Sequence, residues 1–194
     1  INKLSSEKLE RIFKLFGEEK FSKKIANTIV RERNNKIIQT QDLVNIIKSI
    51  KIFKGRLHPA TKIFQSLRIF VNNEISELIN GLTKSTNIVK KNGFIAIVTF
   101  NSIEDKIVKY FFNELSKKEG VSRYSPILKN KKKILKLVNK KPIIPSNYEI
   151  IKNPASRSSK LRIAVKVENE TEVKTNLKQK FQYLLDVEKY SREL

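Results

Sequence analysis

The amino-acid sequence predicts an α/β protein, in which a group of amphipathic helices precedes a half that contains a sheet. Over residues 1–50, apolar side chains recur at intervals of three and four, the period of helices with one buried face. Residues 94–100 read Phe-Ile-Ala-Ile-Val-Thr-Phe and lead directly into a polar turn and another helical pattern. A run of this kind offers no polar face to water, which is typical of a parallel strand that helices cover on both sides.

The charge balance favours a polyanionic partner. The chain has 41 Lys and Arg residues against 19 Asp and Glu residues, a formal net charge of +22 on 194 residues and a pI near 10.1. An excess of this size suits nucleic acid. Because Lys, Ile and Asn are abundant throughout the sequence, AT-rich codon usage is an alternative source of part of the excess.

The residue types that are absent exclude several kinds of chemistry. The chain has no cysteine, which excludes a disulfide framework, a thiolate nucleophile and a thiolate metal site. Its single histidine excludes a multi-histidine cluster, so we expect no metal site. Chemistry in this protein would therefore be metal-free or would depend on a cofactor.

The sequence shows no sign of a membrane or export segment. No apolar run approaches the roughly 18 residues of a membrane span, and no charged-then-apolar signal segment opens the chain. We therefore expect a cytoplasmic protein. The sequence begins at Ile1 and contains no methionine, so we also expect it to be the later part of a longer product.

Three helices are expected before residue 51. Ser5 or Ser6 can cap the first, which Gly17 would stop, and Thr40 can cap the third. Their apolar stripes are Leu9, Ile12, Phe13 and Phe16, then Phe21, Ile25 and Ile29, then Leu43, Val44, Ile46, Ile47 and Ile50. About 50 residues bury too little surface to be stable alone. We therefore interpret residues 1–57 as a helical subdomain that packs on another part of the protein.

One long helix is expected to follow a crossing at residues 51–58. Its stripe runs from Ile63 to Leu82, a turn follows at residues 90–93, and the chain then enters the strand at 94–100. Helix, strand and helix in this order predict a right-handed crossover unit.

Two later runs are candidates for the final strands of the sheet. Residues 134–138 are apolar except for Lys136, and residues 161–167 alternate with the period of a strand. Between the two runs, Ser146 and Glu149 have the spacing of a capping box, which predicts a short helix. From residue 168 to 194 an amphipathic helical tail is expected, as a packed or partner-facing appendage.

Several short motifs follow one another along the chain between residues 16 and 162. They are Phe-Gly-Glu-Glu-Lys-Phe at 16–21, His-Pro-Ala-Thr at 58–61, Phe-Gln-Ser-Leu-Arg at 64–68, Val-Asn-Asn-Glu at 71–74, Phe-Asn-Ser-Ile-Glu-Asp-Lys at 100–106, Lys-Pro-Ile-Ile-Pro-Ser at 141–146, and Asn-Pro-Ala-Ser-Arg-Ser-Ser-Lys-Leu-Arg at 153–162. Together they resemble the bacterial 16S ribosomal RNA cytosine-N4 methyltransferases of the MraW type. The family usually has His where this chain has Asn101.

The resemblance implies methyl transfer from S-adenosyl-L-methionine to the exocyclic amino nitrogen of a cytosine in small-subunit ribosomal RNA. It also implies a Rossmann-like domain into which a helical substrate-recognition domain is inserted. Residues 1–57 would then belong to the helical insert, and residues 58–167 to the carboxyl-terminal half of the Rossmann-like domain. The tail at 168–194 lies beyond the resemblance.

The glycine-rich loop with which the family cradles S-adenosylmethionine would lie upstream of this sequence. The glycines present are isolated and make no cofactor-binding cluster; they are Gly17, Gly55, Gly81, Gly93 and Gly120. We therefore expect no cofactor-binding residue in this chain, and neither cofactor binding nor methylation by this chain alone.

The polar turn after residue 100 holds the candidate catalytic residues Asn101, Ser102, Glu104 and Asp105. Ligands bind at the carboxyl ends of strands in α/β sheets. The Asn101 amide can pair with the Watson–Crick edge of a flipped cytosine, and a nearby carboxylate can take up the lost proton. The alternative is structural: Ser102 and Asp105 have capping spacing, and acidic residues suit the first turn of a helix. No histidine or glycine accompanies Ser102 as a nucleophile would require.

The candidate RNA-binding residues are His58, Arg68, Asn72, Lys141, Arg157, Ser158, Lys160 and Arg162. Cations beside serines in a loop that enters a strand suit phosphate contacts, which fix position without reading sequence. Each has a structural alternative: His58 as a helix start, Arg68 and Asn72 as a solvent-facing pair, and the last loop as a solvated basic segment. The competing function is a non-catalytic RNA- or ribosome-binding module derived from such an enzyme.

Overall fold

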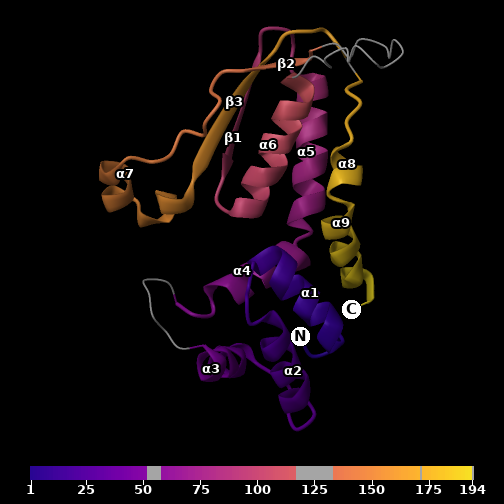
Figure 1. The fold of residues 1–194 in the computed structure, drawn as a ribbon, viewed down its shortest axis with the longest axis vertical. Coiled ribbons are helices and arrows are strands. Elements are labelled where there is room, and N and C mark those ends of the chain that lie inside the picture. Colours follow the sequence, from indigo (N-terminus) through magenta and orange to yellow (C-terminus); the bar gives the residue numbers. More distant parts are fainter. Residues whose placement is uncertain (52–57, 117–132, 171, 194) are drawn as a thin grey trace, which may run out of the picture. The chain divides into compact units, whose positions relative to one another are not determined.

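The computed structural model describes residues 1–51, 58–116, 133–170 and 172–193, and they form two compact units. The first unit comprises Ile1–Ser76 and Gln182–Leu194, and the second comprises Glu77–Phe181 (Figure 1). These divisions differ from the expected boundaries at residues 57 and 167, and the expected functional domains stay a prediction. Most of the expected crossing at 51–58 and of the basic loop after Gly120 lies outside the described residues.

The first unit is helical. It contains α1 (Ser6–Gly17), α2 (Ser22–Arg33), α3 (Thr40–Ile50), α4 (Thr61–Val71), α9 (Gln182–Glu188) and a final 3-10 helix (Lys189–Glu193). α1 lies at the centre, where it packs against α2, α4 and α9. The predicted stripes supply most of the core, and the residues that are fully buried are Leu9, Ile12, Phe13, Phe16, Ile25, Ile29 and Ile47. The prediction is wrong for Phe21, which precedes α2 and is 47% exposed. The amphipathic pattern thus places these helices correctly.

Local signals set most helix ends as predicted, with two corrections. Ser5 caps α1 by accepting a hydrogen bond from the Lys8 backbone. Gly17 ends α1, but Glu18 adopts the left-handed conformation, with φ of 47°. Gly17 instead allows close helix packing, since a methyl group there would lie 2.7 Å from the Lys62 carbonyl oxygen. The cap of α3 is Gln39 rather than Thr40, and Gln39 forms a reciprocal capping box with Asp42.

The expected long helix after Pro59 is two helices. α4 ends at Val71, and α5 (Glu74–Ile88) begins after Asn73, whose φ is 52°. Asparagine tolerates this left-handed conformation better than most residues, so the Asn72–Asn73 pair allows a break that the continuous apolar stripe does not reveal.

The tail supplies the cap of α5. The Glu188 carboxylate accepts hydrogen bonds from the Ile75 backbone at 2.8 Å, the Ser76 backbone at 3.0 Å and the Ser76 hydroxyl. Burial raises the pKa of Glu188 above its usual value, and these hydrogen bonds oppose the increase. The end of the tail is therefore packed against the protein, which was one of the two alternatives expected for it.

The second unit contains a three-stranded antiparallel sheet. Its strands are β1 (Phe94–Thr99), β2 (Leu135–Leu137) and β3 (Lys160–Lys166), in the order β1-β3-β2. The register pairs Ile97 with Arg162 and Thr99 with Lys160. α6 (Ser102–Ser116) packs against all three strands, and α8 (Leu177–Lys180) packs against α6 (Figure 1). The predicted α/β class is confirmed.

The expectation that β1 is parallel and buried on both faces is wrong for the described residues. β1 lies at one edge of the sheet and pairs antiparallel with β3. Ile95 is buried, but Phe94 and Val98 are 67% and 52% exposed. No two described strands run parallel, so the expected right-handed crossover is absent among them. The apolar run predicted that a strand forms here. It did not predict that the neighbouring strand is antiparallel or that part of β1 is exposed.

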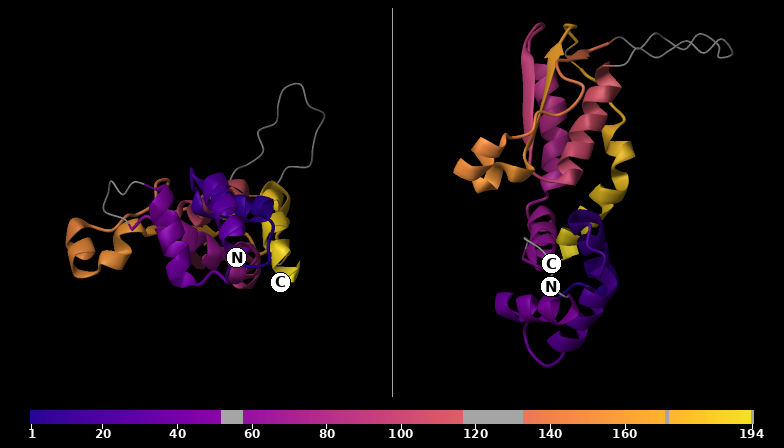
Figure 2. Two further views of the ribbon diagram at one scale, coloured as in Figure 1. Left: turned by 90° about the horizontal axis from the view of Figure 1, so that it is seen from below. Right: turned by 60° about the vertical axis from the view of Figure 1, so that its left-hand side comes forward.

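The two late strands and the short helix between them are confirmed. α7 (Asn147–Lys152) begins where the Ser146 hydroxyl accepts a hydrogen bond from the Glu149 backbone at 3.2 Å. A 3-10 helix (Pro154–Ser158) then leads into β3. The right-hand view of Figure 2 shows α7 standing away from the sheet of this unit, and none of its residues is buried.

Candidate functional site

Asn101 is the first residue after β1, and its side chain caps α6. The amide oxygen accepts hydrogen bonds from the backbone of Ile103 at 3.0 Å and of Glu104 at 2.9 Å. The amide nitrogen donates to the Glu104 carboxylate at 2.5 Å. These contacts occupy both acceptor positions of the Asn101 amide oxygen. They also occupy one of the two N–H groups of the amide nitrogen, so the other N–H group remains for a ligand.

Glu104 completes the cap from inside the helix. Its carboxylate accepts a hydrogen bond from the Phe100 backbone at 2.8 Å. The reciprocal cap therefore joins Asn101 and Glu104, whereas the sequence suggested Ser102 and Asp105. Ser102 is exposed and begins the helix. Two of the candidate catalytic residues thus have a structural role at the end of the strand.

Asp105 points to β3 rather than to the cap. Its carboxylate accepts hydrogen bonds from Arg162, at 2.7 Å from Nε and 3.2 Å from Nη2, and from Lys160 at 3.3 Å. Asp105 and Arg162 are 9% and 8% exposed. The bidentate ion pair fixes the first turn of α6 against the first half of β3, across 57 residues of sequence.

The ion pair keeps Asp105 ionised. Burial alone would raise the pKa of its carboxyl group, but the hydrogen bonds and positive charges of Arg162 and Lys160 outweigh burial and lower that pKa below its usual value. A carboxylate held in this way is a poor proton acceptor. Glu104 is only partly buried.

The same geometry separates the basic candidates in this unit. Arg162 is buried, and its guanidinium group is paired with the Asp105 carboxylate. In this structure its side chain is therefore not accessible to RNA. The Lys160 side chain is 38% exposed and shares the same carboxylate. Arg157 and Ser158 are exposed in the 3-10 helix before β3, and Lys141 is exposed before α7. RNA contact by these residues stays a prediction.

In the first unit, His58 lies at the start of α4. Its Nδ1 accepts a hydrogen bond from the Ala60 backbone at 3.3 Å, and its carbonyl oxygen accepts from the Thr61 backbone and hydroxyl at 3.0 and 2.8 Å. These are the contacts of a helix start, the structural alternative for this residue.

Arg68 and Asn72 lie together, as their spacing on the helix predicts. Both donate to Glu74: Arg68 Nε at 2.7 Å, Arg68 Nη2 at 3.0 Å and Asn72 Nδ2 at 3.3 Å. The Arg68 side chain is 56% exposed, so a phosphate could reach it only in competition with the Glu74 carboxylate.

The described glycines do not form a glycine-rich loop. A glycine-rich loop needs clustered glycines, and Gly17, Gly81 and Gly93 stand alone, none with positive φ. Among the same residues, no group of three His, Cys, Asp or Glu side chains could hold a metal ion. None of the helices in the described ranges is long and apolar enough to cross a bilayer.

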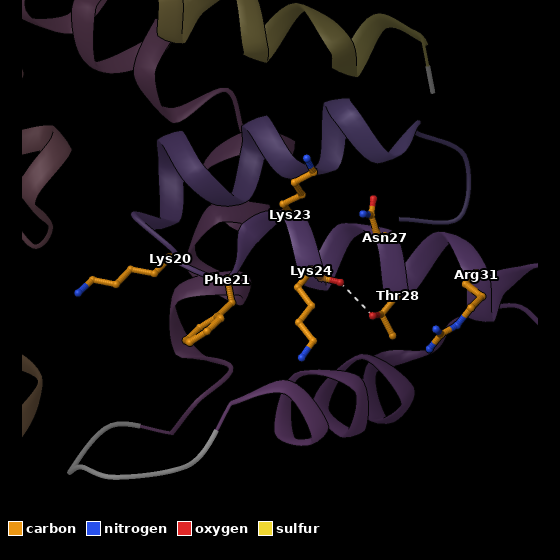
Figure 3. Close-up of a pocket in the computed structure, with 7 residues that line it drawn as sticks. All are labelled: Lys20, Phe21, Lys23, Lys24, Asn27, Thr28 and Arg31. Carbon is orange, nitrogen blue, oxygen red and sulfur yellow. Dashed lines mark hydrogen bonds between the residues drawn. The ribbon is translucent and has the colours of Figure 1, made fainter.

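A basic groove on α2 was not among the predicted sites. It is lined by Lys20, Phe21, Lys23, Lys24, Asn27, Thr28 and Arg31 (Figure 3). The signal was present in the sequence, because Phe21, Lys24, Thr28 and Arg31 follow helical spacing. The predicted apolar stripe of this helix included Phe21, but Phe21 is exposed and lines the basic groove instead.

The fold and the polar turn define a class: an α/β protein in which a helical unit accompanies a sheet, with polar side chains after the first strand. The model of the MraW methylase family matches residues 1–167. The chain belongs to this family.

Curated relatives agree with the family match. The chain is 43% identical over 173 residues to the ribosomal RNA small subunit methyltransferase H of Brachyspira hyodysenteriae, 39% over 171 residues to that of Persephonella marina, and 40% over 172 residues to that of Clostridioides difficile. Each match covers 86% of this chain and 54%, 54% and 55% of the relative. The chain thus spans about half the length of these proteins.

Proposed function

We propose that this chain is part of an enzyme that transfers a methyl group from S-adenosyl-L-methionine to the exocyclic N4 amino group of a cytosine in small-subunit ribosomal RNA. The observation that carries the proposal is the family match over residues 1–167, which includes the polar turn and the basic loop before β3. The relatives' name supports small-subunit ribosomal RNA as the substrate. The partner would be that RNA or a ribosomal particle, in the cytoplasm.

Methylation of an amino nitrogen requires a fixed base and uptake of one proton. In this proposal the remaining N–H group of Asn101 donates to an acceptor on the Watson–Crick edge of cytosine. Glu104 takes up the proton. Asp105 positions the turn through Arg162. The methyl donor would be held by the glycine-rich loop that the family resemblance places upstream of this sequence.

The test is methylation by the full-length gene product on small-subunit particles, with N4-methylcytidine measured by mass spectrometry of digested RNA. Asn101→Ser keeps an oxygen for the cap but removes the amide donor. We expect turnover to fall on the order of tenfold, the effect of about 1.4 kcal/mol, with little change in the thermal midpoint. Asn101→His, the residue usual in the family, is the control and should retain activity. Parental turnover in Asn101→Ser would remove Asn101 from the chemistry, and absence of N4-methylcytidine would refute the proposed reaction.

A non-catalytic RNA- or ribosome-binding module remains the second candidate. The observation that favours it is that Asn101, Glu104 and Asp105 all serve the local structure. The same assay separates the two, because such a module binds the particle and transfers no methyl group.

A further inference from the structure

The exposed side of α2 carries a groove with charge of one sign. Four of its seven lining residues are cations, Lys20, Lys23, Lys24 and Arg31, and none is acidic. In Figure 3, Phe21, Lys24, Thr28 and Arg31 extend to the same side of the helix. Lys24 and Arg31 are seven residues apart, about 10 Å along a helix, which matches roughly three stacked nucleotides at about 3.4 Å each.

The cations of the groove keep their charge largely uncompensated. In the described part of the chain, no ion pair joins Lys20, Lys23 or Lys24 to a carboxylate, and Arg31 has only a loose contact with Glu32 at 3.4 Å. The neighbouring hollow, between α2 and α3, differs. There Lys36 pairs with Asp42 at 2.5 Å, and Glu32 also lines the surface.

Phe21 adds an aromatic surface at one end of the groove. Its side chain is 47% exposed, whereas Phe13 and Phe16 of α1 are fully buried. Exposed aromatic rings beside a cationic track are how proteins bind single-stranded nucleic acid, because bases stack on the ring while cations contact phosphates. An acidic peptide would use the cations but would gain nothing from a stacking surface.

We propose that this groove binds a single-stranded segment of RNA, with a base stacked on Phe21 and phosphates at Lys24 and Arg31. The inference rests on the proposed function and deepens it by giving part of the substrate a place on the helical unit. Lys20 and Lys23 raise the local positive potential, and Thr28 lies between the two phosphate contacts.

The test is binding of a fluorescent ten-nucleotide single-stranded RNA to the 194-residue chain, measured by anisotropy between 50 and 300 mM salt. Lys24→Ala with Arg31→Ala should reduce the slope of log affinity against log salt by about 1.4, from roughly 0.7 per phosphate contact on a single strand. The matched control is Lys14→Ala with Lys48→Ala, which removes two exposed cations on α1 and α3 outside the groove. It should change the slope by much less.

Phe21→Leu separates stacking from charge. Leucine keeps an apolar side chain but has no ring, so we expect affinity to fall about tenfold with the salt slope unchanged. Phe21→Tyr should bind like the parent. Thermal unfolding of each variant should match the parent, since these side chains are exposed.

Three outcomes would overturn the inference. One is an equal effect of the groove and control pairs on RNA binding. Another is that Phe21→Leu leaves the RNA affinity unchanged and that poly-glutamate displaces the labelled RNA as well as unlabelled RNA does. This result would indicate an acidic protein partner. The third is no RNA binding by the parent chain. None of them decides the proposed methylation, which is measured separately on the full-length product.

Discussion

Two groups of cations in this protein have opposite fates. In the sheet unit, Lys160 and Arg162 of β3 meet the carboxylate of Asp105, and the arginine is buried. On α2 of the helical unit, Lys24 and Arg31 remain exposed around a groove without an acidic lining residue. The basic loop that stood out as a motif therefore includes a structural ion pair, while a less conspicuous helix presents the accessible charge.

The difference shows why counting basic residues does not locate a binding surface. Whether a cation faces a partner depends on which carboxylates the fold brings within about 4 Å of it. Asp105 lies 57 residues from Arg162 along the chain, so no local sequence pattern predicts this ion pair.

Arg162→Ala should destabilise the protein most. It leaves the buried Asp105 carboxylate with only Lys160, at 3.3 Å, and breaking a buried pair from one side costs about 3 kcal/mol. Urea denaturation of the chain should show the loss. Arg157→Ala removes the same charge from an exposed site and should stay within about 0.5 kcal/mol of the parent. Equal costs for the two would mean that Arg162 is not a structural residue.

Acid should weaken the same ion pair. The folded-state pKa of Asp105 is lowered, so its contribution is present above the unfolded value, about 3.9, and is lost as pH falls through the lower folded value. The stability difference between the parent and Asp105→Asn should therefore shrink as pH decreases from 5 to 2.5. Other carboxylates titrate in both proteins and cancel in the difference. A difference that stays constant over this range would contradict the pairing.

Lys160→Ala should have the smallest effect. The Lys160 side chain is 38% exposed and 3.3 Å from Asp105, so solvent weakens the attraction and the loss should be roughly 0.2–1 kcal/mol. Denaturation midpoints measured beside Arg162→Ala would check the order. A loss as large as that of Arg162→Ala would assign the two cations equal structural roles.

Most element positions followed from local sequence. Ser5 and Ser146 cap the helices that they were expected to cap, and the strands near residues 135 and 163 lie where alternation and apolar runs placed them. These features depend on side chains within a few positions of one another. The candidate turn was likewise placed correctly, directly after the first strand.

Other features escaped because their cause is distant or is masked by a stronger signal. The break before α5 lies inside a continuous apolar stripe, and only the left-handed Asn73 reveals it. The cap of α5 comes from Glu188, more than 100 residues away. Within the candidate site, the sequence suggested Ser102 and Asp105 as the capping pair, but Asn101 and Glu104 form it.

The α/β class, the family and most helical faces could be predicted from the amino-acid sequence, because periodicity, capping residues and ordered motifs are local properties. The antiparallel pairing of β1 with β3, the ion pair of Asp105 with Arg162 and the exposed charge of the α2 groove could not be predicted in this way. Strand pairing and ion pairing join residues that are far apart in the chain. Their energies depend on distance and burial, which exist only once the chain has folded.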